Sequence, residues 1–306
     1  VDNLSYGYIE RINDIQDKIT FINTDVKELK DSNITDIDTI IHCSAIAPLP
    51  DNQQNPYRSF EQNVAMCGAV SDFATKIGCK NVIFFSSGAI YEGSGDRECR
   101  ETDEISTKLI YPTSKYLAEQ LFESVAKTYD IKVVSIRLFN LYGPNQDYFR
   151  KQPPLLGYLI KSYLKGEEIK LYASENAKRD YIYIDDLYEL IVKIISKFKN
   201  IESGSFIPVN AGGGNTYSVY DIVSLFEEIV GSKVEYTQGD KSSFWDKYPL
   251  IFDRKLPLIE SYLVDEVDKV AISNIDFAKK YFEWEPKVDM KKGLLECFNF
   301  ARSVVK

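Results

Sequence analysis

The stretch Asp38-Thr39-Ile40-Ile41-His42-Cys43-Ser44-Ala45 is continuous and apolar, in the way that a β-strand covered on both faces should be. Runs of the same kind lie on either side of it in the chain, at Thr20 to Asp25, Asn81 to Phe85 and Lys132 to Leu138. Val1 to Ser5 is expected to be the tail of a further strand. Between these runs, apolar residues recur at helical spacing, in Pro56 to Lys76 and in Thr113 to Tyr129. This regular alternation predicts right-handed crossovers and an α/β fold with a parallel, doubly wound sheet.

The pattern becomes less regular after Gly143-Pro144. We expect helices from Asp186 to Phe198, behind the cap Asp185, and from the cap Ser218 to Val230. Short strands are expected at Glu168 to Tyr172, Asp180 to Ile184 and Ser205 to Asn210. Residues 238 to 270 are rich in charge, proline and aromatic side chains and show no clear helix or strand pattern. The second half of the chain therefore predicts a smaller, mixed α/β region.

Several polar residues stand where the predicted parallel strands end. They are Asp2, Asp25, His42, Ser87 and Asn140. Ligands on doubly wound sheets bind at the carboxyl ends of the strands, so a single ligand could touch all five.

Tyr111-Pro112-Thr113-Ser114-Lys115 carries the pattern most suggestive of catalysis, because a Tyr and a Lys four apart share one face of a helix. A Lys ammonium held near a phenol would lower the pKa of the phenol and make it an acid/base group. A hydroxyl of Ser86 or Ser87, at the end of the strand upstream, could share a substrate oxygen with Tyr111. Taken alone, the motif is weak. A Tyr-x-x-x-Lys sequence in an arbitrary protein is more often a partly buried helix Tyr with a solvated Lys.

The composition excludes several classes of function. The 306 residues include 37 Lys and Arg against 46 Asp and Glu, a net charge of −9 that argues against nucleic acid or an anionic membrane as the main partner. The single histidine leaves almost no material for a His-based zinc site or a Ser-His-Asp triad. No apolar run approaches the length of a membrane span. Five scattered cysteines without a C-x-x-C are typical of reduced, cytoplasmic thiols.

Taken together and in order, these motifs resemble the extended short-chain dehydrogenase/reductase family, the NAD-dependent epimerase/dehydratase group that acts on nucleotide sugars. The resemblance runs from Val1 to about Tyr183, with a weaker match at Trp284-Glu285-Pro286. It implies a Rossmann-type NAD-binding domain of residues 1–144 plus about 180–212, and a substrate domain of about 145–179 and 213–306. The family's glycine-rich turn is missing, so we expect the sequence to lack its first ~30 residues, the size of a βα unit.

The resemblance also implies roles for individual residues. Ser87, Tyr111 and Lys115 would be catalytic, and Asp2 would hold the adenosine ribose and favour NAD over NADP. His42 is given no chemical role. The residues placed against NAD are Asp2, Asn3, Asp25, Val26, Cys43, Ser44, Ala45, Asn63, Tyr111, Lys115 and Leu138. The residues placed against a nucleotide-diphosphate sugar are Ser87, Asn140, Arg179 and Tyr181, and no metal site is implied.

The residues after the two serines discriminate among the reactions of this family. Dehydratases of the family that this chain resembles carry a pair of acidic residues where this chain has Gly88-Ala89. Decarboxylases of the family usually keep a Glu in this segment, and that Glu is absent too. The remaining Ser, Tyr and Lys suffice for hydride transfer alone. This favours an NAD-dependent epimerase that inverts C4 of the sugar through a transient 4-keto intermediate. The alternatives are an NAD(P)H-dependent 4-ketoreductase of a nucleotide deoxy-sugar and a non-catalytic dinucleotide-binding protein.

Two further expectations concern partners. Extended members of the family are often homodimers through a four-helix contact, which would here use Pro56 to Lys76 and Thr113 to Tyr129. The family usually offers another Arg to the nucleotide within residues 238–270, where Arg254 is the only arginine. The sequence therefore does not identify the sugar or the nucleobase of the substrate.

Overall fold

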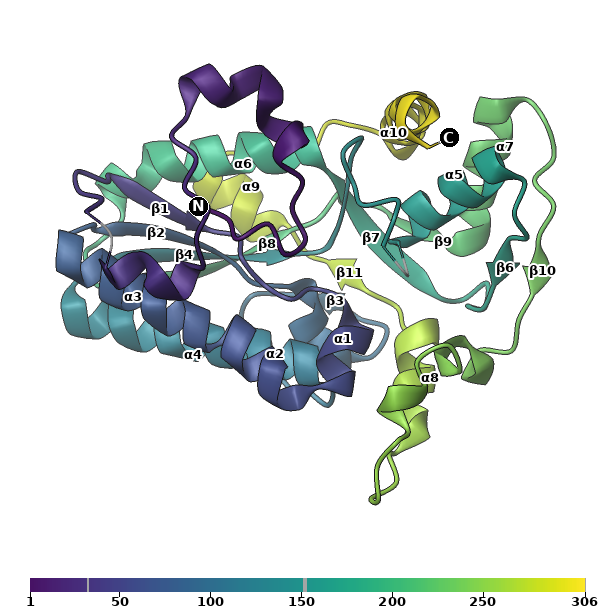
Figure 1. The fold of residues 1–306 in the computed structure, drawn as a ribbon, viewed down its shortest axis with the longest axis horizontal. Helices are drawn as coiled ribbons and strands as arrows, with labels where there is room; N and C mark the ends of the chain where they lie inside the picture. The colour runs from purple at the N-terminus through teal and green to yellow at the C-terminus, as the bar shows by residue number, and fades with distance from the viewer. Residues whose placement is uncertain (32, 151–152, 306) are drawn as a thin grey trace. The chain divides into compact units, whose positions relative to one another are not determined.

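The computed structural model describes residues 1–31, 33–150 and 153–305. The chain forms two compact units (Figure 1). Unit 1 consists of Val1–Ser87, Leu109–Arg137 and Ile195–Pro208, and unit 2 consists of Gly88–Lys108, Leu138–Ile194 and Val209–Lys306. This division rests on the contacts within each unit and does not identify the ligand that a unit binds. The division into an NAD-binding domain and a substrate-binding domain therefore stays a prediction.

The largest sheet has four strands in the order β1-β2-β4-β8, which are Thr39–His42, Asn81–Phe85, Lys132–Leu138 and Phe206–Ala211. The β1–β2 and β2–β4 pairs are parallel, with Thr39 opposite Asn81 and Asn81 opposite Lys132. Ile83, Val133 and Val134 at the centre of these strands are fully buried. The predicted parallel α/β sheet is confirmed.

Helices α3 (Ala65–Ile77) and α4 (Ile110–Tyr129) lie on the same face of this sheet (Figure 1). Their apolar side chains join the strands in one core, where the rings of Phe84 on β2 and Phe122 on α4 are 4.9 Å apart. The helix predicted from Pro56 to Lys76 is interrupted at Val64 and forms α2 (Pro56–Asn63) and α3. Helices α1 (Leu49–Gln54), α2 and α3 all pack against α4.

The strands predicted at Val1 to Ser5 and Thr20 to Asp25 shrink to a single parallel bridge between Asp2 and Asn23. The side chain of Asp2 accepts a hydrogen bond from the backbone of Leu4, and that of Asn3 accepts one from Ser5. Such local side-chain bonds compete with strand pairing. Leu4 also has a φ of 56°, which ends the extended backbone. Two short 3-10 helices, η1 (Ile9–Lys18) and η2 (Val26–Asp31), fill the remainder of this region.

Unit 2 contains a three-stranded sheet in the order β5-β7-β9, which are Asn140–Tyr142, Lys178–Tyr183 and Thr216–Ser218. A core of apolar residues joins this sheet to α5 (Leu155–Lys165), α7 (Val219–Val230) and α10 (Met290–Val304). Ser218 caps α7 as predicted, through a reciprocal capping box with Asp221. The cap predicted at Asp185 is wrong, because α6 (Ile184–Lys197) already includes Asp185 in its first turn.

The smaller elements complete the chain. They are η3 (Gly88–Ser94), β3 (Glu98–Cys99), β6 (Lys170–Leu171), η4 (Phe198–Asn200), β10 (Thr237–Gln238), η5 (Ser242–Trp245), η6 (Pro249–Ile251), α8 (Glu260–Asp268), β11 (Ile272–Ser273) and α9 (Asp276–Phe282). β3 pairs with β11, and β6 pairs with β10. The segment without a clear pattern, 238–270, therefore holds short turns of helix and ends in α8.

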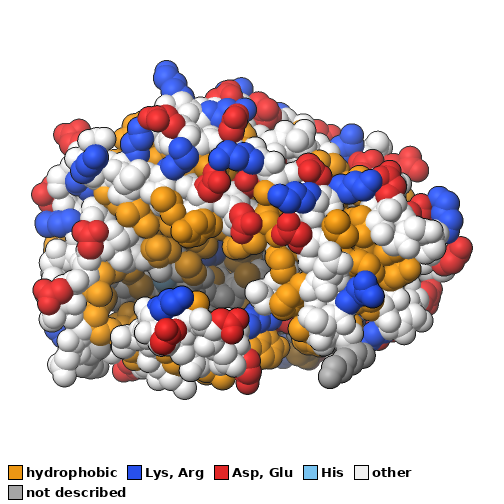
Figure 2. Space-filling model, turned by 90° about the horizontal axis from the view of Figure 1, so that it is seen from above, with side chains coloured by type: hydrophobic (Ala, Val, Ile, Leu, Met, Phe, Trp, Pro, Cys, Tyr) orange, Lys and Arg blue, Asp and Glu red, His pale blue; other side chains and the backbone are white. Residues whose placement is uncertain are grey.

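The surface mixes charges of both signs. On the face drawn in Figure 2, Lys and Arg side chains alternate with Asp and Glu around apolar patches, and no continuous basic area is seen there. None of the helices within residues 1–31, 33–150 and 153–305 combines the length and apolar character that crossing a bilayer requires.

Candidate active site

The three residues predicted to be catalytic all lie in unit 1. Ser87 follows β2 by two residues, and Tyr111 and Lys115 occupy the first turns of α4. The side chains of Tyr111 and Ser87 are joined by a hydrogen bond. The strand-end serine and the helix tyrosine therefore lie within hydrogen-bond distance of one another, and their sharing of a substrate oxygen stays a prediction.

Lys115 is 4% exposed and points at the end of β2. Its Nζ donates a hydrogen bond of 2.7 Å to the carbonyl oxygen of Phe85 and lies 5.0 Å from the centre of the Phe84 ring. Burial lowers the pKa of Lys115 to about 8, an effect that nearby thiol and carboxyl groups partly oppose. The ammonium thus fastens α4 to the strand that leads into Ser87.

The pKa of Tyr111 moves opposite to the direction expected from its spacing to Lys115. Burial raises the pKa of the phenol, and the hydrogen bond with Ser87 lowers it only in part. The Lys115 ammonium donates its hydrogen bond to the carbonyl of Phe85, and the phenol of Tyr111 takes its own from Ser87. In the protein without ligands, Tyr111 is therefore a neutral phenol at neutral pH.

Asn63 braces this arrangement from α2 and is 1% exposed. Its Oδ1 accepts a hydrogen bond of 2.8 Å from the backbone of Ile46, and its Nδ2 donates bonds of 3.0 Å to Ser114 Oγ and to Asn52 Oδ1. The loop after β1 is thereby tied to the residue next to Lys115. Sequence reasoning missed Asn52 and Ser114, since neither belongs to a recognisable spacing.

The other residues predicted to contact a cofactor lie at or near strand ends of unit 1, except Leu138, which belongs to unit 2. Asn3 Nδ2 donates to Asp25 Oδ2 at 3.3 Å, and Val26 is buried in the core. Cys43 is exposed, Ser44 and Ala45 are partly exposed, and Leu138 ends β4. The carboxylates of Asp2 and Asp25 are acceptors, as ribose hydroxyls require, and the Lys115 ammonium has three donors, one of them on Phe85. This set of groups fits a dinucleotide.

His42 is part of the core. Its ring stacks on Phe84 and meets Phe122 edge-on, and burial lowers its pKa to about 3, with the charge of Lys115 adding to the shift. The imidazole is therefore neutral at physiological pH.

The residues predicted to contact the substrate, Asn140, Arg179 and Tyr181, lie on β5 and β7 of unit 2. Asn140 stands opposite Tyr181 in the strand pairing, and its Nδ2 donates to the carbonyl of Asp180 at 2.6 Å. The guanidinium of Arg179 donates to the carbonyls of Glu266, Val267 and Lys269 at the end of α8. The structure thus brings this group together and uses Arg179 to cap a helix.

Gly88, directly after Ser87, leaves no room for a side chain. A Cβ at this position would lie 2.9 Å from the ring of Phe139. An acidic residue here would therefore force Phe139 to move, which explains why Gly stands at this position.

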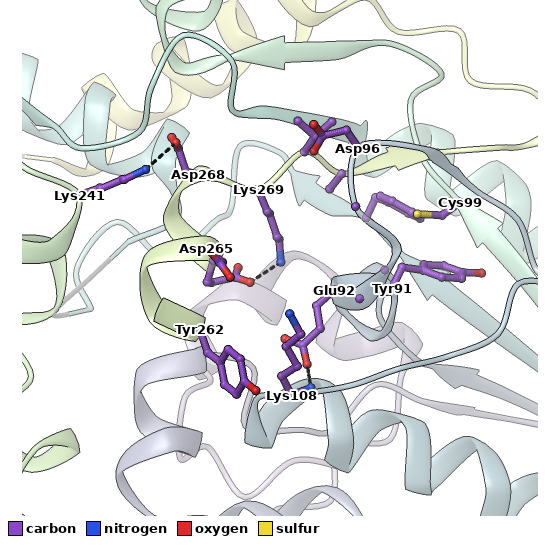
Figure 3. A pocket seen from close by; sticks show the side chains of 17 residues that line it. Tyr91, Glu92, Asp96, Cys99, Lys108, Lys241, Tyr262, Asp265, Asp268 and Lys269 are labelled. Atoms are coloured by element: carbon purple, nitrogen blue, oxygen red, sulfur yellow. Dashed lines mark hydrogen bonds and ion pairs between the residues drawn. The ribbon is translucent and has the colours of Figure 1, made fainter. Parts of the chain in front are cut away.

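A pocket of about 400 Å³ lies within unit 2 (Figure 3). Its walls come from η3, the loop through β3, Lys108, Phe139 and the C-terminal half of α8 with the residues that follow it. Lysines, carboxylates and the ring of Tyr262 line it. No cluster of residues able to hold a metal ion occurs within the part of the chain that the structure describes.

Comparison with known proteins settles the family. Residues 2–212 match the model of the NAD dependent epimerase/dehydratase family. The chain belongs to this family. A UDP-glucuronate 4-epimerase of Thermodesulfobacterium geofontis is 24% identical over 278 residues, which cover 88% of this chain and 74% of that protein.

Two solved structures share the fold along nearly the whole chain. UDP-glucose 4-epimerase of Thermotoga maritima, crystallised with UDP-glucose, has a TM-score of 0.80 at 23% identity and covers 100% of this chain and 90% of its own. UDP-N-acetylglucosamine 4-epimerase of Methanobrevibacter ruminantium, in complex with UDP-N-acetylmuramic acid, has a TM-score of 0.82 at 21% identity and covers 99% and 89%. The resemblance to the epimerase/dehydratase family and its Rossmann-type fold is confirmed.

The two adjacent serines of this family member offer a matched pair of variants. Ser86 is 4% exposed, and its Oγ has no hydrogen-bond partner among the described residues. A buried hydroxyl without a partner costs about 1–3 kcal/mol, so Ser86→Ala is expected to unfold at the same or a higher urea concentration and to keep activity. Ser87→Ala is expected to lower kcat about 10²- to 10³-fold. A Ser86→Ala protein less stable than the wild type would show that the hydroxyl has a partner.

Proposed function

We propose that this epimerase/dehydratase family member is an NAD-dependent epimerase that inverts C4 of a nucleotide sugar through a transient 4-keto intermediate. The observation that carries the proposal is the hydrogen bond between Tyr111 and Ser87, with Lys115 one turn further along α4. Gly88, packed against Phe139, supports an epimerase over a dehydratase with an acid at that position.

In the proposed mechanism, the oxygen of Tyr111 takes a proton from the C4 hydroxyl and later returns it. Ser87 hydrogen-bonds the same sugar oxygen and stabilises its changing charge. Lys115 holds α4 against the end of β2 and so fixes the position of Tyr111. NAD supplies the redox chemistry when bound, by accepting and returning a hydride. Burial raises the pKa of Tyr111, and NAD in its oxidised form would supply a positive charge that lowers it.

The cofactor proposal rests on groups at the strand ends of unit 1. Asp2 would accept hydrogen bonds from the adenosine ribose and repel the 2′-phosphate of NADP. Lys115 would hold the nicotinamide ribose with the donors that Phe85 does not use. Asn3, Asp25, Val26, Cys43, Ser44, Ala45, Asn63 and Leu138 are the further proposed contacts.

The substrate proposal is a UDP-sugar, since the relatives act on sugars attached to UDP. Asn140, Arg179 and Tyr181 are the proposed contacts in unit 2. A guanidinium has five donors, so Arg179 can cap α8 and still offer a hydrogen bond to a diphosphate.

The test is to incubate the purified protein and NAD with a panel of UDP-, dTDP-, GDP- and CDP-sugars and to follow the products by NMR and the NADH absorbance. A 4-epimer formed without net change in NADH is the expected result. Product that forms only with stoichiometric loss of NADH or NADPH would instead identify a 4-ketoreductase. Absence of turnover across the panel would support a non-catalytic dinucleotide-binding protein.

We further propose a homodimer through α2 and α4. Tyr57 and Phe60 on α2 and Leu117 on α4 are large apolar side chains that are exposed in the single chain. A monomer found by light scattering after size-exclusion chromatography would contradict this proposal.

The five cysteines are free, which supports a reducing compartment, and we propose that the protein is located in the cytoplasm.

A further inference from the structure

Asn52 is a polar side chain in a buried position. It lies on the short helix α1 and is 1% exposed. A buried amide costs free energy unless its donors and acceptors are paired, and an apolar side chain avoids that cost. The residues that pair with Asn52 all belong to unit 1. Their identity indicates what an amide does at this position.

The amide nitrogen of Asn52 holds the loop that follows β1. Its Nδ2 donates hydrogen bonds to the carbonyl oxygens of Ile46 at 3.0 Å and Pro48 at 2.8 Å. Carbonyl oxygens only accept, so the amide can take no other orientation. The proposed cofactor contacts Ser44 and Ala45 directly precede Ile46. These two bonds, the loop arm of Asn52, thus fix one end of the segment proposed to meet NAD.

The amide oxygen of Asn52 starts a chain of hydrogen bonds that ends on the backbone of Tyr111. Oδ1 accepts from Asn63 Nδ2 at 3.0 Å and from Ser59 Oγ. Asn63 Nδ2 also donates to Ser114 Oγ at 3.0 Å, and Ser114 Oγ donates to the carbonyl of Tyr111 at 2.8 Å. The side chains of this helix arm are buried, so they bond to one another in place of water, and loss of one partner affects the next.

We propose that Asn52 is a positioning residue for the proposed epimerase reaction, because it sets the loop that receives NAD and, through Asn63 and Ser114, the main chain of Tyr111. The inference rests on the proposed function. It adds Asn52 and Ser114 to the residues on which that function depends. The loop arm acts on cofactor binding, and the helix arm acts on the position of the proposed proton carrier.

The experiment measures two quantities for each variant. The first is the Kd of NAD by fluorescence titration, which also counts the NAD-binding sites. The second is kcat per NAD-binding site, with UDP-glucose, UDP-N-acetylglucosamine and UDP-glucuronate each assayed as substrate. A variant that only loses stability has fewer sites, while its Kd and its kcat per site stay at the wild-type values.

Asn52→Leu removes both arms without adding charge. It is expected to raise the Kd of NAD about 5- to 30-fold and to lower kcat per site about 3- to 10-fold, the effect of one or two lost buried hydrogen bonds. Asn52→Asp loses the two donors and keeps the acceptor oxygen, so it should raise the Kd of NAD and leave kcat per site within about twofold. A raised Kd in both variants excludes repulsion between a carboxylate and the phosphates of NAD as the cause.

Gln54→Leu is the matched control for the loop arm. It removes an amide from the same helix, one that donates to the carbonyl of Pro50 within α1. The Kd of NAD and kcat per site should both equal those of the wild type.

Ser114→Ala and Ser71→Ala are a matched pair for the helix arm. Each removes a buried hydroxyl that donates at 2.8 Å to a backbone carbonyl of its own helix. Ser114 also accepts from Asn63, whereas Ser71 lies on α3, outside the helix arm. Ser114→Ala is expected to lower kcat per site about 3- to 10-fold with the Kd of NAD unchanged. Ser71→Ala should leave both values unchanged.

An unchanged Kd of NAD in both Asn52 variants, or equal kcat per site in Ser114→Ala and Ser71→Ala, would overturn the inference. Where Asn52→Leu does not fold, Asn52→Asp and the serine pair give the same decision. A wild type that binds NAD without turning over any of the three sugars, with the Kd of NAD raised in Asn52→Leu, would overturn only the proposed epimerase reaction and support the loop arm.

Discussion

Tyr111→Phe is expected to lower kcat by about 10²- to 10⁴-fold, the usual contribution of a positioned acid/base group, while NAD affinity stays nearly unchanged. The phenol oxygen is the proposed proton carrier, and its hydrogen bond to Ser87 sets it against the end of β2. The phenyl ring of Phe keeps the packing at the start of α4. The measurement is epimer formation by NMR, with NAD binding followed by fluorescence titration.

Tyr116→Phe provides the matched control, since it removes the same atom from the next tyrosine of α4. It should leave kcat within the error of the wild type. Turnover by Tyr111→Phe at the wild-type rate would contradict the assignment of the catalytic proton carrier. A parallel loss of NAD binding would show that the phenol serves the cofactor and would separate the two roles.

Glu119→Leu is expected to lower the free energy of unfolding by about 3–5 kcal/mol, because it leaves a buried charge without its partner. Glu119 on α4 is 1% exposed and Arg137 on β4 is 5% exposed. Arg137 binds both carboxylate oxygens of Glu119, at 2.8 and 3.1 Å, and Ser135 Oγ donates to the same carboxylate at 3.0 Å. Urea unfolding followed by circular dichroism measures the loss.

Two further variants test the cause of that loss. Glu123→Leu, one turn later on α4, removes the exposed pair with Lys127 and should change stability by less than about 1 kcal/mol. The double variant Glu119→Leu and Arg137→Leu removes both buried charges and should recover much of the stability. A double variant as unstable as Glu119→Leu would show that packing, and not the unpaired charge, dominates.

Much of unit 1 could be predicted because its signals are local. The apolar runs that include Thr39–His42, Asn81–Phe85 and Lys132–Leu138 are strands, and the helix with Tyr111 and Lys115 starts as expected. The first two predicted strands were wrong in extent, since the side chains of Asp2 and Asn3 accept hydrogen bonds from the backbone two residues later and only the Asp2–Asn23 bridge joins the two segments. In residues 238–270, charge, proline and aromatics obscured the periodicity from which helix α8 could have been predicted.

The sequence by itself determined the fold class and the family, and it predicted the set Ser87, Tyr111 and Lys115, because periodicity and motif spacing depend on residues close in the chain. Only the tertiary structure decided which partners the buried side chains take. It placed Lys115 on the carbonyl of Phe85, reversed the expected pKa shift of Tyr111, and set Arg179 on the end of α8. These contacts join residues far apart in sequence, and a local pattern does not specify which buried donor meets which acceptor.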